Sequence, residues 1–359
     1  MKKHQLTAIL TFHWANNYGA LLQSWALKTF LQKHGVRVKF INLVPVALPK
    51  GIRAWWHGRY FWFFRKFYLG IWDRCCKTPE KLRKKYRNID TCVIGSDQVW
   101  NRRITGDFCF AYFGDFLFPS ALPIPYAASV GEDSWPYTEN ETANIATLLS
   151  HVPEPLLVRE NQLKIWCEEK IKVSSLLVCD PSLLNGDVSV LLNNKQARCG
   201  QGQIVSYKFS RSHEYYDFMQ KLSAKFNLPV LLLADPVQKT GMRSVFKLSV
   251  NQWIGAITSG DLVITDSFHG LCLALLGHRD FLLLPNDKVK RNSRQLSLLE
   301  KLGLEDRMSL SYDEALEKAK KLPQIDYVKV DKLLEQWRQE SGEALLKALE
   351  QAWNWKKSQ

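Results

Sequence analysis

The sequence predicts an α/β protein made of two domains, each built on a parallel sheet. Apolar runs of strand length alternate with amphipathic stretches of helix length over most of the chain. The alternation stops at a polar stretch, residues 185–202, and then starts again. The length of 359 residues allows two domains that each bury a core. We therefore expect domains over residues 1–185 and 186–325, followed by a C-terminal helix over 326–359.

In the first domain the elements follow one another in the order that a parallel sheet requires. A strand over 6–12 leads into an Asn- and Gly-containing turn, which a helix over 20–34 and a strand over 36–43 follow. The remaining strands are short apolar runs at 91–94, 124–127, 156–158 and 176–179. Open α/β sheets bind ligands at the carboxyl ends of their strands, so the polar residues directly after these runs are the functional candidates.

The second domain alternates without interruption, and a long amphipathic helix follows it. We expect strands at 204–207, 230–233, 262–265 and 281–284, and helices at 212–226, 249–257, 268–276 and 333–353. Substrate specificity is expected from the connecting loops 102–123 and 234–248.

Positive charge is concentrated near the start of the chain, whose formal net charge is +14. Residues 50–87 hold twelve basic and two acidic residues, interleaved with aromatic ones from Trp55 to Trp72. This composition is typical of a helix that lies on an anionic membrane surface. Two other interpretations stay open: a single-strand nucleic-acid platform, and an excursion that packs its aromatic side chains on its own domain. No nucleic-acid motif accompanies the segment, so we favour the membrane surface and expect no nucleic-acid partner.

The cysteines and apolar segments favour the cytoplasm. The eight cysteines form no C-x-x-C pair and no paired framework, as expected for free thiols in a reducing compartment. No apolar run approaches the ~18 residues of a membrane-spanning helix, and residues 6–12 lack a signal-peptide cleavage site. We expect a cytoplasmic protein that is peripheral on the inner membrane if the basic segment binds lipid. No spacing of His, Cys or carboxylates predicts a metal site.

The sharpest polar cluster follows the expected strand at 262–265. Asp266, Ser267 and His269 come where this strand gives way to a helix, and Gly270 follows them. The amide groups and dipole of a helix N-terminus favour an anion, and an imidazole transfers protons near neutral pH. Asp266 is placed either to orient His269 or to cap the helix. His269 is therefore the candidate acid or base.

Two strands of the first domain also end in polar turns. The turn after 91–94 offers a carboxylate and an amide beside small residues, a composition that an Asx-type turn explains without function: Gly95, Ser96, Asp97 and Gln98. The turn after the first strand is similar to a phosphate-binding turn but lacks the spacing for dinucleotide or Walker-type binding: Asn16, Asn17, Tyr18 and Gly19.

Cations stand at two further places. Arg159 ends the strand at 156–158, where an Arg suits either a bidentate contact with an anionic ligand or an internal salt bridge. A basic loop that includes Arg291 and Arg294 enters a helix, and it either binds an anion or forms solvated surface.

Taken together and in this order, these clusters resemble the polysaccharide pyruvyl transferase family. The resemblance runs from about residue 7 to residue 307. The matching segments are Thr11–His13, Asn16–Ala20 with Gln23, Gly95–Asn101, Tyr126–Gly131, Val158–Glu160, Asp180–Leu184, Thr265–Gly270 and Asn292–Leu304.

The resemblance implies a fold and a reaction. The fold is similar to that of B-type glycosyltransferases, with two Rossmann-like domains and a cleft between them. The reaction transfers a pyruvyl group from phosphoenolpyruvate to a sugar diol as a cyclic ketal, in surface polysaccharide biosynthesis. Phosphoenolpyruvate is then a co-substrate, no cofactor is needed, and the acceptor is a saccharide or a lipid-linked oligosaccharide.

The resemblance also distributes roles among the candidate residues. His269 is the acid or base, and Asp97 orients the acceptor or acts as a base. Donor binding falls to Arg159, Ser267, Gly270, Arg291 and Arg294. Acceptor binding falls to Asn16, Asn17, Tyr18, Gly19, Ser96 and Gln98.

Two features depart from the family pattern. Some members have an Arg two residues before the His, where this chain has Ser267, so other cations, Lys208 among them, must meet the donor charge. The second departure is the basic, aromatic connection between residues 44 and 90. Two other functions stay open: a sugar-nucleotide glycosyltransferase that acts on a polysaccharide or lipid-linked acceptor, and a non-catalytic polysaccharide- or membrane-binding protein.

Overall fold

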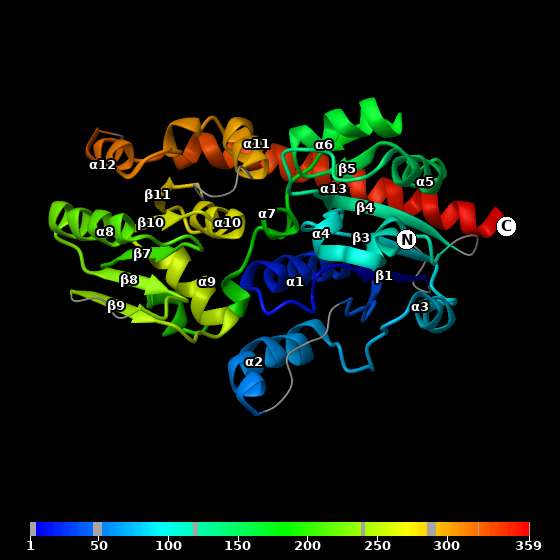
Figure 1. Cartoon of the computed structure of the whole chain (residues 1–359), viewed down its shortest axis with the longest axis horizontal. Coiled ribbons are helices and arrows are strands. Elements are labelled where there is room, and N and C mark those ends of the chain that lie inside the picture. The colour runs from blue at the N-terminus through cyan, green and yellow to red at the C-terminus, as the bar shows by residue number, and fades with distance from the viewer. Residues whose placement is uncertain are drawn as a thin grey trace. The chain divides into compact units, whose positions relative to one another are not determined.

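The chain folds into two α/β units. The computed structural model describes residues 5–45, 52–117, 121–237, 241–285, 292–321 and 323–358, with the backbone alone for 52–57. One compact unit consists of Met1–Asn185 with Glu335–Gln359, and the other of Gly186–Leu334. Each unit is built on one parallel sheet with helices around it (Figure 1). The predicted fold class is confirmed: two parallel α/β sheets and a long C-terminal helix.

The first unit contains a six-stranded parallel sheet in the order β2-β1-β3-β4-β5-β6. Its strands are β1 Leu6–Leu10, β2 Arg37–Phe40, β3 Thr91–Ile94, β4 Leu122–Ala128, β5 Leu156–Val158 and β6 Ser175–Leu177. The inner strands β3, β4 and β5 are buried along their whole length. Burial on both faces explains why their sequences are mainly apolar runs rather than alternating patterns.

Helices connect these strands and cover the sheet. The α-helices of this unit are α1 Tyr18–Lys33, α2 Ile52–Phe64, α3 Pro79–Tyr86, α4 Arg102–Thr105, α5 Glu139–Leu149, α6 Asn161–Trp166 and α7 Pro181–Asn185. The last helix of the chain, α13 (Tyr327–Ser358), starts in the second unit and ends in the first. Its Trp337 Nε1 donates to the carbonyl of Leu177 at 3.2 Å, so α13 stabilises the edge strand β6.

The second unit contains a five-stranded parallel sheet in the order β11-β10-β7-β8-β9. Its strands are β7 Ile204–Tyr207, β8 Val230–Leu233, β9 Met242–Val245, β10 Leu262–Thr265 and β11 Asp280–Leu283. Its helices are α8 His213–Phe226, α9 Val250–Ser259, α10 Phe268–Leu276, α11 Ser293–Leu302 and α12 Tyr312–Lys321. Strand β10 lies between β11 and β7, which places the turn after it well inside the unit.

The two expected specificity loops contain regular structure. The segment 234–248 includes β9, an edge strand that pairs with β8 and is partly exposed, and its short, mixed sequence gives little strand signal. The segment 102–123 includes α4 and the 3₁₀ stretch Gly106–Phe113, whose Tyr112 is buried in the core.

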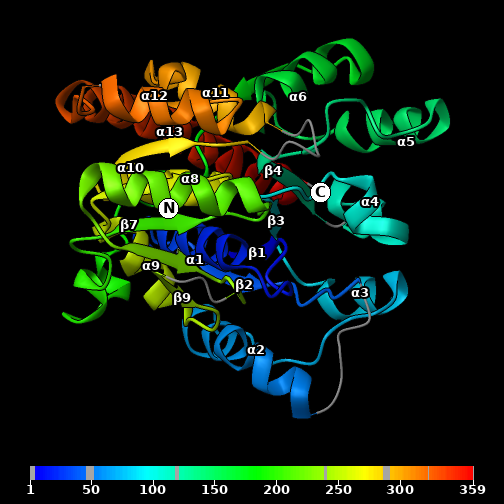
Figure 2. The ribbon, with the colours of Figure 1, turned by 60° about the vertical axis from the view of Figure 1, so that its left-hand side comes forward.

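The basic, aromatic connection forms α2, a π-helical turn over Arg65–Leu69, and α3. Figures 1 and 2 both show α2 at the outside of the first unit, next to α1. Phe61, Phe64 and Leu69 are buried, so one side of this segment does pack on its own domain. Among the described residues, no helix is long and apolar enough to cross a bilayer.

Candidate active site

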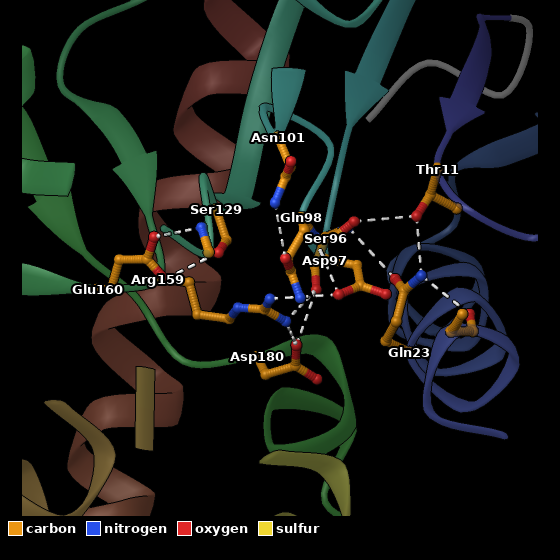
Figure 3. A network of polar contacts seen from close by, with 12 residues as sticks. Thr11, Gln23, Ser96, Asp97, Gln98, Asn101, Ser129, Arg159, Glu160 and Asp180 are labelled. Carbon is orange, nitrogen blue, oxygen red and sulfur yellow. Dashed lines mark hydrogen bonds and ion pairs between the residues drawn. The ribbon is translucent and has the colours of Figure 1, made fainter. Parts of the chain in front are cut away.

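Polar side chains from four strand ends meet at the carboxyl edge of the first sheet. Thr11 follows β1, Asp97 follows β3, Arg159 follows β5 and Asp180 follows β6. Figure 3 shows the side chains of Asp97, Arg159 and Asp180 pointing toward one another. Parallel strands that end at one edge bring these residues together although up to 169 positions separate them in sequence, Thr11 to Asp180.

Arg159 lies at the centre of this network, between two carboxylates. Its side chain is 1% exposed, and its guanidinium donates to Asp180 Oδ2 at 2.9 Å and to Asp97 Oδ1 at 3.4 Å. Ser96 Oγ donates to the same Asp180 oxygen at 2.7 Å. Burial alone lowers the pKa of Arg159, but the charges of Asp180 and Asp97 outweigh it and raise that pKa. The guanidinium is therefore a permanently charged, internally paired group.

Of the two carboxylates that pair with Arg159, that of Asp97 is the one exposed to solvent. Its side chain is 14% exposed, whereas that of Asp180 is 0% exposed. The backbone of Asp97 lies in the left-handed region, with φ 78°. Its Oδ1 also accepts from the backbone N–H of Gln98 at 2.9 Å. The carboxylate is thus held in place from two sides and remains partly exposed to solvent.

The backbone before Asp97 is fixed by buried contacts. Gln23 of α1 donates through Nε2 to Thr11 Oγ1 at 2.8 Å and accepts from the Ser96 N–H at 3.2 Å. Thr11 Oγ1 in turn donates to the Ser96 carbonyl at 3.0 Å. Gly95 has φ 126°, and a Cβ there would lie 2.1 Å from the Tyr126 carbonyl oxygen, so this close approach requires glycine.

A third carboxylate, that of Glu160, connects the neighbouring turns. Glu160 accepts from Ser129 Oγ at 2.8 Å and from the backbone N–H groups of Val130 at 3.1 Å and Gly131 at 3.2 Å. Gln98, a predicted acceptor residue, accepts from Asn101 Nδ2 at 3.0 Å, so its carbonyl oxygen serves the fold.

The four predicted acceptor residues after β1 have different surroundings. Asn17 caps α1, because its Oδ1 accepts from the backbone N–H at the third helical position, 3.1 Å away. Tyr18 and Gly19 are buried in the first turn of that helix. Asn16 is exposed, and its Oδ1 accepts from Arg65 Nη2 at 3.0 Å. Asn16 is thus the member of this group most accessible to a ligand.

Arg65 has a role in this loop that the sequence pattern did not reveal. Its Nη1 donates to the carbonyls of Trp14 and Ala15, both at 3.2 Å. Burial against the loop lowers the pKa of Arg65 to about 10. A contact across 50 residues of sequence leaves no local signal, whereas the composition of the segment suggested a surface charge.

His13 also holds this loop in place, through hydrogen bonds in the interior of the unit. It is buried, with Nδ1 3.1 Å from the Thr11 carbonyl and Nε2 3.2 Å from Asn42 Oδ1. Burial lowers the pKa of His13 to about 4, although the hydrogen bonds to Asn42 and Thr11 oppose this. His13 is therefore neutral near pH 7, and its position suits support of the loop rather than proton transfer.

The second unit holds His269 in the first turn of α10, directly after β10. Ser267 caps this helix, because its Oγ accepts from the Gly270 N–H at 3.2 Å. A Cβ on Gly270 would lie 2.6 Å from Thr265 Oγ1, so the first turn needs a residue without a side chain there. Two predicted donor residues, Ser267 and Gly270, thus have local roles that fix the position of His269, which is 7% exposed.

Asp266 does not cap α10, since Ser267 takes that role. Its carboxylate accepts from the backbone N–H of Phe209 at 2.8 Å and of Ser210 at 3.1 Å, and lies 3.3 Å from Lys208 Nζ. The side chains of Lys208 and Asp266 are each 1% exposed. The charge of Lys208 is therefore balanced inside the unit.

Other cations of the second unit differ in their surroundings. Arg294 is half-buried near the start of α11, while Arg291 lies outside the described residues. A further polar group was missed: Asp235, after β8, lies 3.3 Å from Arg211 Nε and accepts from Tyr216 Oη at 3.0 Å. Its place just after a predicted strand is the signal that could have found it. Over the described residues, no group of three or more His, Cys, Asp or Glu is arranged to hold a metal ion.

The fold is similar to that of solved UDP-N-acetylglucosamine 2-epimerases. The Neisseria meningitidis enzyme bound to UDP-GlcNAc aligns with a TM-score of 0.55 at 10% identity, over 96% of this chain and 99% of that chain. The Methanocaldococcus jannaschii enzyme in complex with UDP-GlcNAc and UDP gives 0.51 at 12% identity, over 96% and 99%. At such identities the likeness shows the fold alone, an α/β chain with two parallel sheets, as the resemblance implied. No curated protein matches the chain in sequence.

The family comparison is more specific than the fold. The polysaccharide pyruvyl transferase family matches residues 17–288, more than half of the chain. The match takes in the turn after β3, Arg159 and the turn after β10. The chain therefore belongs to the polysaccharide pyruvyl transferase family and is a transferase.

Proposed function

We propose that this enzyme transfers a pyruvyl group from phosphoenolpyruvate to two hydroxyls of a saccharide, forming a cyclic ketal during surface polysaccharide biosynthesis. The observation that carries the proposal is the family match over residues 17–288. The polar clusters of the chain supply what the reaction needs, namely an imidazole at a helix start and a carboxylate that is partly exposed.

The charges of the two polar clusters, one in each unit, indicate that one cluster binds the acceptor and the other binds the donor. Among the described residues of this cluster in the first unit, Asp97 and Asp180 share the cation Arg159, so two carboxylates stand against one positive charge. Such a site repels an anionic donor and suits the hydroxyls of a sugar, which donate hydrogen bonds to carboxylates. We assign the acceptor to this cluster, with Asp97 orienting a hydroxyl or taking its proton, and Arg159 as a positioning residue.

The cluster of the second unit suits the donor. The start of α10 presents amide groups and a favourable dipole to an anion. Asp266 pairs with Lys208, so we assign the charge of the donor to the two predicted residues Arg294, near the start of α11, and Arg291. In this proposal Ser267 and Gly270 act by shaping the turn that binds the donor.

The reaction then balances with one acid and one base. His269 gives a proton to the methylene carbon of phosphoenolpyruvate, which becomes the methyl group, and the adjacent carbon becomes electrophilic. One acceptor hydroxyl attacks that carbon and loses its proton to a base, for which Asp97 is the candidate. The C–O bond to phosphate breaks, the second hydroxyl attacks, and its proton leaves with the base or the phosphate. The products are a pyruvyl ketal and inorganic phosphate.

The acceptor we propose is a lipid-linked oligosaccharide at the inner membrane face, with the enzyme peripheral on that surface in the cytoplasm. The support is the exposed aromatic and basic face of the connection that follows β2, since a lipid-linked acceptor would require such a surface.

A donor-binding and product assay tests the proposal. Purified enzyme is titrated calorimetrically with phosphoenolpyruvate and with UDP- and GDP-sugars, and then incubated with phosphoenolpyruvate and a panel of p-nitrophenyl hexosides. We expect saturable binding of phosphoenolpyruvate, and phosphate release that accompanies a pyruvylated glycoside detected by mass spectrometry. Binding of a nucleotide sugar without binding of phosphoenolpyruvate would contradict the proposal and favour a glycosyltransferase.

A further inference from the structure

An unusual group of aromatic side chains lies exposed on the connection that follows β2. Four of them are between 43% and 61% exposed, and we call these the aromatic patch: Trp62, Phe63, Phe67 and Trp72. The rings of Phe63 and Phe67 pack at 4.3 Å, and Phe67 packs edge-on against Trp72 at 5.6 Å. These side chains pack on one another and not into the core, so they form an apolar surface that is exposed to solvent.

The patch belongs to a segment that is firmly attached to its unit. The other side of the same segment buries Phe61, Phe64 and Leu69. Lys28 of α1 donates to the carbonyl of Tyr68 at 2.8 Å. Some aromatic residues of the segment are thus buried and others are exposed. Because the segment itself is well packed, loose packing does not explain the exposed ones.

Positive charge accompanies the patch. Lys66 lies over the rings of Trp72 at 5.1 Å and Trp62 at 6.0 Å, and Arg74 and Lys77 are exposed just beyond. The neighbouring acid Asp73 is paired with Lys85 at 2.5 Å. The surface around the aromatic patch is therefore positive, which complements an anionic partner.

We propose that the aromatic patch docks this enzyme on an anionic lipid bilayer, with its rings at the headgroup level and the basic side chains on lipid phosphates. Trp and long basic side chains favour that level of a bilayer. The rings of Phe63, Phe67 and Trp72 pack against one another, whereas a single-strand platform presents separate ring faces on which bases stack. The geometry therefore favours a lipid surface over nucleic acid.

The docking segment is bonded to the candidate acceptor loop. Arg65 belongs to the same π-helical turn as Phe67, and it holds the carbonyls of Trp14 and Ala15 and the side chain of Asn16. A membrane contact at the aromatic patch would thus fix the loop that presents Asn16 relative to the bilayer. This second step rests on the proposed function, because it gives a lipid-linked acceptor a defined approach to the loop.

The test measures vesicle binding without donor or acceptor, so its outcome is independent of pyruvyl transfer. Wild-type enzyme is floated with vesicles of phosphatidylcholine alone and with vesicles of equal parts phosphatidylglycerol and phosphatidylcholine, at low and at high salt. The variant Phe63→Ser/Phe67→Ser is compared with Phe246→Ser, which removes an aromatic side chain that is 46% exposed in the second unit. Arg74→Gln/Lys77→Gln is compared with Lys221→Gln/Lys225→Gln, which removes two exposed charges from α8.

We expect wild-type enzyme to bind the anionic vesicles, with binding weakened by salt. The patch variant should lose about tenfold or more of its partition coefficient, and the Arg74/Lys77 variant about fivefold per charge, while both controls bind like wild type. Unchanged thermal midpoints establish that the variants fold. Equal binding by the patch variant, no binding by wild type, or patch-dependent binding of an oligothymidylate or of a second copy of the chain instead of vesicles would overturn the proposal.

Discussion

Replacing Arg159 by Met removes the cation from the buried network of the first unit. Asp180 and Asp97 would then face each other without the guanidinium that lies 2.9 and 3.4 Å from their oxygens. Removal of one partner from a buried ion pair costs about 3–5 kcal/mol, because the remaining charge is uncompensated. A domain is stable by about 5–15 kcal/mol, so this loss is a large part of the total. We expect the free energy of unfolding to fall by about 3–5 kcal/mol.

Urea unfolding measures this loss, and hydrogen exchange of peptides from β3 and β5 assigns it to the first unit. The matched control is Arg83→Met, since Arg83 lies 3.7 Å from Asp115 but is 56% exposed. Exposed pairs contribute about 0–1 kcal/mol. The double variant Arg159→Met/Asp180→Asn should lose less than the sum of the single variants, because it also removes one of the stranded charges.

Kinetics separate a positioning role from donor binding. Arg159→Lys keeps the charge but loses the fork that holds Asp97 and Asp180. If Arg159 positions Asp97, this variant lowers kcat or raises KM for the acceptor and leaves the affinity for phosphoenolpyruvate near that of wild type. A loss of stability below about 1 kcal/mol in Arg159→Met, or a selective loss of phosphoenolpyruvate affinity in Arg159→Lys, would refute the reasoning.

Three other substitutions test separate parts of the structure. Gly95→Ala should destabilise the first unit by at least about 2 kcal/mol, because its Cβ would meet the Tyr126 carbonyl at 2.1 Å; a urea midpoint like that of wild type would contradict this. His13 has its pKa lowered to about 4, so the unfolded chain binds more protons between pH 6.5 and 4 and stability falls as the pH drops through that window, by about 3 kcal/mol at its end. In urea titrations, the free energy of unfolding of wild type should therefore fall more steeply below pH 6.5 than that of His13→Gln. Parallel curves would refute the assignment. His269→Gln should lower turnover about 10²-fold or more while phosphoenolpyruvate binding persists; phosphate-release assays and calorimetry on one preparation decide this, and full turnover would exclude His269 as the acid.

The sequence predicted the interior of the fold better than its edges. The strands at 91–94, 156–158, 204–207, 230–233 and 262–265 were located to the residue. Each is an apolar run between polar turns, a pattern that burial in a parallel sheet imposes. The edge strand β9 was missed because it has one neighbouring strand and is partly exposed, so its sequence need not be an apolar run.

The sequence predicted which residues lie at the candidate site, but not which of them pair with one another. The rule that ligands bind after strand ends selected Ser96, Asp97 and Arg159, and the structure brings these three together. The carboxylate of Asp180 pairs with Arg159 through the tertiary fold, and no local pattern states that pairing. The same holds for Arg65, whose contact with the loop after β1 spans the whole aromatic connection.

The most direct measurement is the thermal unfolding midpoint of the wild-type enzyme as a function of phosphoenolpyruvate concentration, beside a matched series of UDP- and GDP-sugars. A ligand that binds the folded state stabilises it by about 2.7 kcal/mol at a hundred times its Kd. If phosphoenolpyruvate is the donor, the midpoint rises with its concentration and saturates, while nucleotide sugars have no such effect. A rise with a nucleotide sugar and a constant midpoint with phosphoenolpyruvate would contradict pyruvyl transfer by this chain.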